Sequence, residues 1–204
     1  MISIITGDIV NSRKASDFTW LAALKKTLIK FGKQPNDWDI FRGDSFQLKI
    51  AIEEAFFAAF LIKSYLKQIE NIDVRIGVGI GKGINNSKNI TEANGEAFIN
   101  SGKVFEGLVK KQLIAIKSPW TELDDEFNLA LELALLTMNN WTKNSAEVFQ
   151  ISLENPTLTQ NEIADKLGIT QGRVSERQKR AGYDAISKLE KRYRKQIKEK
   201  TSLL

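Results

Sequence analysis

The sequence predicts an α+β protein, with a sheet region of order βαββαβαβ over residues 1–118 and an all-α region over residues 119–204. Three observations indicate this class. Short β-branched or glycine-containing runs alternate with segments whose apolar residues recur every three or four positions, which is typical of strands and amphipathic helices. After Pro119 the pattern is entirely helical, and the basic residues concentrate in the last quarter of the chain.

Five strand patterns and three helix patterns make up the first region. ISIITGDIV is β-branched throughout, as expected for a strand buried on both faces. From Ser16 the apolar residues take helical spacing, beginning with Phe18 and Leu21. WDIFRGDSFQLKI indicates two strands joined in a hairpin at residues 42–44. The remaining elements are predicted as a helix at 52–69 with an aromatic core stripe, a strand at 73–83, a helix at 95–111 and a strand at 112–119.

Composition limits the chemistry that this chain can perform. Without cysteine or histidine it has no thiolate nucleophile, zinc–thiolate site, Ser-His-Asp triad or imidazole base. Catalysis would therefore depend on carboxylates, Lys, Arg, hydroxyls and a hard cation such as Mg²⁺. No apolar run approaches the roughly 18 to 20 residues of a membrane span, and the N-terminus lacks signal-peptide features. We expect a cytoplasmic protein without a membrane partner.

The net charge of +5 is unevenly distributed. Residues 155–204 hold twelve Lys and Arg against six Asp and Glu, giving +6, whereas residues 1–154 hold eighteen against nineteen, giving −1. This distribution favours a polyanion as the partner of the C-terminal part, although a solvated lysine-rich helix also explains such a run.

The C-terminal region contains a helix-turn-helix pattern over residues 159–181. Residues 122–139 and 142–153 are predicted to be helical, which places the domain boundary near Ser118 to Glu122. Thr159 and Glu162 then form a T-x-x-E capping box, and Gly168 is suited to end that helix. The alternative is a helical hairpin that only packs or dimerises.

The second helix of this pattern carries the side chains expected to meet DNA. Thr170 is suited to cap it, and Val174 is its expected buried anchor. Gln and Ser can bond base edges, while Arg and Lys bind phosphates or guanine. The predicted DNA-binding residues are Thr170, Gln171, Arg173, Ser175, Glu176, Arg177, Lys179 and Arg180. An apolar residue is usual near Arg177 or Gln178, where this sequence is polar.

Two Gly-Asp pairs stand where strands end or turn. A Mg²⁺ site that works with phosphates needs carboxylates from different segments to converge. Asp8 ends one strand and Asp44 lies in the hairpin turn, so we predict both as metal ligands, with the carbonyl of Ile9 as a further ligand. Alternatively, these aspartates are ordinary cap and turn residues. The helix start at Asn11, Ser12 and Arg13 favours phosphate.

GDIVNSRK, RGDSFQ and RIGVGIGKG, in that order and spacing, resemble the metal-binding strand, the Gly-Asp hairpin and the R-I-G strand of class III nucleotidyl cyclases. GEAFINSGKVFEGL resembles the cyclase helix that carries the catalytic Asn and Arg. The resemblance covers residues 1–117 and implies a ferredoxin-like, cyclase-like palm that binds a nucleotide with Mg²⁺. It adds Arg42, Gly43 and Lys103 to the nucleotide-binding candidates and implies a homodimer. With the helix-turn-helix included, the chain resembles the bacterial SatD family.

The cyclase catalytic pair is incomplete in this chain. One register places Ile99 at the Asn position and Lys103 at the Arg position, which makes Lys103 the candidate catalytic residue. The other register keeps Asn100 but places Val104 at the Arg position. The leading hypothesis is therefore a DNA-binding transcription regulator that senses a nucleotide with Mg²⁺. The alternatives are an active nucleotidyl cyclase or related phosphoryl-transfer enzyme, and a scaffold that binds neither ligand.

Overall fold

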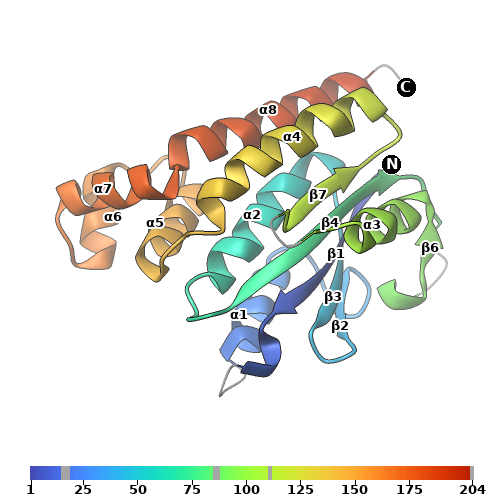
Figure 1. Ribbon diagram of the computed structural model, residues 1–204, viewed down its shortest axis with the longest axis horizontal. Coiled ribbons are helices and arrows are strands. Elements are labelled where there is room, and N and C mark those ends of the chain that lie inside the picture. The colour runs from blue at the N-terminus through green and yellow to red at the C-terminus, as the bar shows by residue number, and fades with distance from the viewer. Residues whose placement is uncertain (15–18, 85–87, 110–111, 203–204) are drawn as a thin grey trace.

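The centre of the computed structural model is a five-stranded mixed sheet with strand order β2-β3-β1-β4-β7 (Figure 1). The structure describes residues 1–14, 19–84, 88–109 and 112–202. The strands are β1 (Ile2–Val10), β2 (Trp38–Phe41), β3 (Ser45–Ile50), β4 (Asp73–Gly81) and β7 (Ile114–Lys117), with a separate ribbon of β5 (Gly83–Ile84) and β6 (Asn94–Gly95). Strand β1 is antiparallel to β3 and β4, and β4 is parallel to β7. The α+β class is confirmed, and the major elements follow the predicted order.

The described part of the chain contains eight α-helices. They are α1 (Thr19–Leu28), α2 (Ala55–Leu66), α3 (Glu96–Glu106), α4 (Thr121–Met138), α5 (Lys143–Glu154), α6 (Gln160–Leu167), α7 (Gln171–Ala181) and α8 (Tyr183–Thr201), with short 3-10 turns at Ser12–Lys14, Ile52–Glu54 and Ile90–Glu92. Helices α6 and α7 lie beyond α5, away from the sheet (Figure 1). The predicted start of the first helix, with Ser16 and Phe18, lies outside the described residues. Within them, no helix combines the length and apolar character needed to cross a bilayer.

Strand β4 presents a different kind of residue to each face of the sheet. Val74, Ile76, Val78 and Ile80 are fully buried in the main apolar cluster. The glycines between them lie against α3: a Cβ built on Gly79 would stand 2.1 Å from the backbone nitrogen of Ser101. Helix α3 therefore lies directly on the backbone of β4, because the glycines leave no side chain between them.

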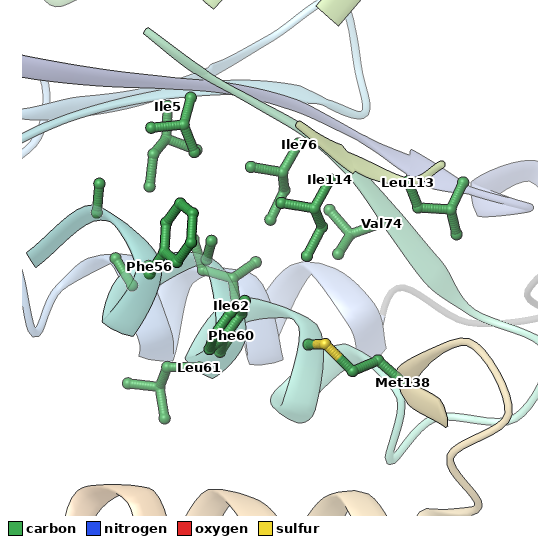
Figure 2. Packing of buried hydrophobic residues seen from close by; sticks show 14 of the residues in the cluster. Ile5, Phe56, Phe60, Leu61, Ile62, Val74, Ile76, Leu113, Ile114 and Met138 are labelled. Carbon is green, nitrogen blue, oxygen red and sulfur yellow. The ribbon is translucent and has the colours of Figure 1, made fainter. Parts of the chain in front are cut away.

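Helix α2 is buried on nearly all sides, with ten of its twelve residues buried. Figure 2 shows Ile5, Val74 and Ile76 of the sheet above Phe56 and Ile62 of this helix. On its other side, α2 packs against α5 and α8. A helix that is apolar all round is expected when it is enclosed on every side. The predicted aromatic core of this segment is confirmed by Phe56 and Phe60, which have no exposed surface.

The C-terminal helices share the apolar core of the sheet. Tyr193 of α8 stacks on Phe56 with ring centroids 3.9 Å apart, and Phe127 of α4 meets both rings edge-on. The Tyr193 hydroxyl donates to the carbonyl of Ile52 at 2.6 Å. Burial raises the pKa of this phenol well above its ordinary value, so it stays a neutral donor. The apolar core is thus continuous across residue 118. The domain boundary near that residue stays a prediction.

Helix α4 also protects the outer edge of the sheet. Strand β7 is an edge strand, whose unpaired backbone groups would otherwise be open to another strand. The side-chain amide of Asn128 accepts from the Ile116 N–H at 2.8 Å and donates to the Ile116 carbonyl at 3.0 Å. One amide side chain thereby occupies the positions that a neighbouring strand would take, and it fixes α4 beside the sheet.

Candidate functional sites

The two Gly-Asp segments lie side by side in the sheet. Asp8 lies inside β1, which continues to Val10, and not at the end of the strand as predicted. It is opposite Ser45 of β3, and the Ile9 N–H donates to the carbonyl of Asp44 at 3.1 Å. The Ile9 side chain is buried in the core. The antiparallel pairing of β1 with β3 brings Asp8 next to the hairpin turn, because the end of one strand meets the start of the other.

Asp8 is held by Arg75, a residue that the sequence analysis did not assign to the site. The two residues are directly opposite each other on β1 and β4. Nε of Arg75 donates to Asp8 Oδ1 at 2.9 Å and Nη2 donates to Oδ2, while the guanidinium lies 5.2 Å from the ring centre of Phe105. The hydrogen bonds to Asp8 raise the pKa of Arg75, and Asp44 adds to the effect. The strand register was needed to find this pair, since 67 positions separate the two residues.

Asp44 is held from the other side by the turn that follows β1. Ser12 Oγ donates to Asp44 Oδ2 in a short hydrogen bond. The neighbouring Asn11, with a φ of 64°, instead donates its side-chain amide to the carbonyl of Asn71 at 2.9 Å. Of these two residues, Ser12 contacts a candidate metal ligand, whereas Asn11 supports a neighbouring loop.

The other predicted nucleotide-binding residues lie on the surface of the protein. Arg13, Arg42, Gly43 and Lys103 are exposed. Arg42 and Gly43 both have positive φ values, of 51° and 89°, as the tight hairpin requires. The structure thus brings Asp8, Asp44, Ser12 and Arg75 together.

The two residues considered for the cyclase Asn position both lack a free amide. Asn100 is buried on α3 and donates to the carbonyl of Ile80 at 2.8 Å, which gives it a structural role between α3 and β4. Ile99 offers no polar group and is 56% exposed on the outer side of the same helix.

A hollow of about 410 Å³ opens beside the Asp8–Arg75 pair. It is lined by Asp8, Ile9, Val10, Arg75, Leu108, Val109 and Leu113. Apolar walls with one carboxylate and one guanidinium suit a small ligand that has an apolar part and an anionic group.

The donor set at this site fits a divalent metal only together with a phosphate. In the described residues, no three acidic, histidine or cysteine side chains gather into a metal-binding group. Mg²⁺ is commonly held by one or two carboxylates while phosphate oxygens and waters complete its octahedron. Asp8 and Asp44 would supply the carboxylates. Arg75 already donates to both oxygens of Asp8, so a guanidinium that turned to a phosphate would leave this carboxylate more open to a cation.

A second candidate site is formed by α6, α7 and the turn between them. The predicted capping box is present, with the Glu162 N–H donating to Thr159 Oγ1 and the Thr159 N–H donating to the Glu162 carboxylate. The hydrogen bonds that the Thr159 N–H and hydroxyl donate to this carboxylate lower the pKa of Glu162. Gly168 ends α6 with a φ of 61°, and Thr170 accepts from the Arg173 N–H at the start of α7. Local side-chain chemistry thus sets both helix ends at the turn.

Helix α5 completes a three-helix unit with α6 and α7. Val148 of α5, Ile163 and Ala164 of α6, and Val174 of α7 form a separate small apolar cluster. The polar residue at the usual apolar position is accommodated by a network: Gln178 accepts from Gln160 and donates to Ser152, each at 2.8 Å. Paired amides replace the missing apolar contact, so the sequence departure does not leave a buried group unsatisfied.

Most of the predicted DNA-binding side chains are exposed on α7. The exposed residues of that set are Thr170, which caps the helix, and Gln171, Arg173, Ser175, Glu176, Lys179 and Arg180. Arg177 differs, since its guanidinium lies 3.6 Å from the carboxylate of Glu147 on α5. Arg180 pairs with Glu176 within the helix at 2.6 Å. Arg173 and Lys179 are therefore the clearest candidates for phosphate contacts.

The family model that describes the SatD family matches residues 1–200. The chain belongs to the SatD family. The match runs from β1 into α8, so it includes both the sheet with its carboxylate pair and the α5–α7 unit. A search of curated proteins finds no match for this SatD family member.

Proposed function

We propose that this SatD family member is a DNA-binding transcription regulator in which α7 reads the major groove. The observation that carries the proposal is the α6–turn–α7 geometry, with a capping box, a left-handed glycine and a shared apolar anchor. This arrangement supports a helix-turn-helix, because small residues let two helices cross closely while the second exposes its polar side. The basic excess of residues 155–204 supports a polyanionic partner.

The proposal predicts a steep loss of DNA affinity with salt. Each phosphate neutralised contributes about −0.9 to the slope of log affinity against log salt concentration. Arg173→Ala is expected to weaken binding to all sequences and to flatten the slope by about one. Lys25→Ala is the control, because it removes one positive charge from an exposed position on α1, outside α6 and α7. The measurement is a titration of labelled duplexes at several salt concentrations, with a genomic fragment and a scrambled one.

The same titrations distinguish side chains that contact base edges from side chains that contact phosphates. Gln171→Ala and Ser175→Ala are expected to change which sequences are preferred, since these side chains would face base edges. Failure of the intact protein to bind duplex DNA at low salt, with and without nucleotide, contradicts the regulator proposal.

We further propose that the hollow beside Asp8 binds a nucleotide with Mg²⁺ and that the sheet region acts as a sensor. The strand order β2-β3-β1-β4 supports a ferredoxin-like, cyclase-like palm. The Asp8–Arg75 pair supports phosphate recognition, since a guanidinium that leaves a carboxylate for a phosphate frees that carboxylate for a cation. Active cyclisation remains the alternative. The buried amide of Asn100 favours a sensor, because it already donates to Ile80.

The nucleotide proposal predicts coupled binding. Mg²⁺ is expected to tighten nucleotide binding in the wild type, and Asp44→Asn is expected to remove that effect. Asp39→Asn on β2 is the control, since Asp39 accepts hydrogen bonds from Gln34 and the Ile40 N–H near the same hairpin. Calorimetric titration with each nucleoside triphosphate measures binding, and chromatography of the same mixtures measures product. Repeated turnover to a cyclic product that is lost in Asp44→Asn would replace the sensor with an enzyme.

A further inference from the structure

Helix α4 carries apolar side chains on two opposite faces. One face, with Phe127, Leu131 and Leu135, is buried in the main core. On the other face, Leu129, Leu133 and Leu136 are 60%, 62% and 70% exposed. A helix at the surface of a monomer normally has a polar outer face. The three exposed leucines, called the leucine stripe below, instead make the outer face of α4 apolar, as is typical of a contact surface.

A groove of about 690 Å³ runs beside the leucine stripe. Its apolar lining includes Leu113, Leu135, Leu136 and Val109, the last of which is 62% exposed. The stripe and the groove together form a ridge next to a recess, which is the shape that a second helix with the same spacing can fit.

The charges around the stripe exclude a polyanion as its occupant. Helix α4 contains five acidic residues and no basic residue. DNA and anionic membrane surfaces would be repelled by this helix. Glu126 on one flank faces Arg192 of α8 at 3.7 Å, and α8 runs alongside α4 (Figure 1). That ion pair lowers the charge repulsion that two copies of this surface would otherwise meet.

The spacing of the stripe indicates a helix as the occupant. Leu129, Leu133 and Leu136 are separated by four and then three positions, which is the interval of a helix–helix seam. Helix α4 of a second copy supplies the same seam. A contact between identical surfaces closes by two-fold symmetry and buries both stripes at once.

We propose that the leucine stripe of α4 is the interface of a homodimer in which α4 packs against α4 of a second copy. Leu133, the central leucine, meets its own counterpart at the two-fold axis whether the two helices run parallel or antiparallel. The interface borders the candidate nucleotide site, because Val109 and Leu113 line both the groove and the hollow beside Asp8.

The first test measures association without any ligand. Sedimentation over about a hundredfold range of protein concentration is expected to show a monomer–dimer equilibrium. Leu133→Glu is expected to weaken dimerisation at least tenfold while leaving the thermal unfolding of the monomer intact. Ile29→Glu is the matched control, because Ile29 is an equally exposed aliphatic residue, at 63%, outside α4. A wild-type protein that stays monomeric over the whole range overturns the proposal.

The second test locates the axis and uses the absence of cysteine from this chain. Leu133→Cys introduces a single thiol, which is expected to form an intermolecular disulfide under mild oxidation. Ile29→Cys is expected to stay monomeric on a non-reducing gel. If the dimer forms but Leu133→Cys crosslinks no better than Ile29→Cys, the interface lies elsewhere and the proposal is wrong. Both tests omit DNA and nucleotide, so they are independent of the proposed function.

Discussion

Replacing Tyr193 with alanine is expected to lower the free energy of unfolding by about 3–5 kcal/mol. Tyr193 is completely buried between the sheet region and the C-terminal helices, with Phe56 stacked on it and Phe127 against its edge. Its removal leaves a cavity at the junction of α2, α4 and α8, where the rigid aromatic neighbours cannot collapse fully. Chemical denaturation followed by circular dichroism and tryptophan fluorescence measures the loss.

The matched variant is Tyr193→Phe, which keeps the stacked ring and removes only the hydroxyl. It is expected to cost about 1–2 kcal/mol, because the carbonyl of Ile52 loses its donor. Because the core is continuous across residue 118, wild type and both variants are expected to unfold in one transition. Separate transitions for the two regions, or an alanine variant no less stable than the phenylalanine variant, would contradict this interpretation of the core.

Replacing Gly79 with alanine is expected to destabilise the protein by about 1–3 kcal/mol or more, despite adding only one methyl group. The added Cβ would stand 2.1 Å from the Ser101 nitrogen and 2.2 Å from the Ala97 carbonyl oxygen. Both neighbours are backbone atoms of α3, so no side-chain rotation relieves the clash. The helix must move away from the sheet, which also disturbs the bond from Asn100 to Ile80. Thermal unfolding measures the change.

Gly102 provides the control for this prediction. It lies on the same helix, and a Cβ built there meets nothing within 4 Å. Gly102→Ala is expected to stabilise the protein by up to about 1 kcal/mol, because alanine is the better helix former. If Gly79→Ala and Gly102→Ala change the stability by similar amounts, the glycines of β4 are not needed for the close packing of α3 on this strand.

The parts of this fold that were predicted correctly depend on short-range patterns. The β-branched run of β1, the hairpin at residues 42–44 and the capping box of Thr159 and Glu162 each involve neighbours within a few positions. Backbone conformation and helix capping respond to those neighbours directly, so periodicity and turn chemistry are sufficient to predict them. The sequence also shows the alternation of glycine with Val and Ile in β4. This alternation indicates that another element can lie close to the glycine face of the strand, as α3 does.

The α+β class, the order of the main strands and helices, the excluded chemistry and the hairpin position of Asp44 could be predicted from the sequence. The contacts between residues far apart in the chain could be found only in the folded structure: Arg75 with Asp8, Gln178 with Gln160 and Ser152, and Tyr193 with Phe56. Strand register and helix crossing set those contacts. They depend on how the whole core packs, so no local pattern around either partner encodes them.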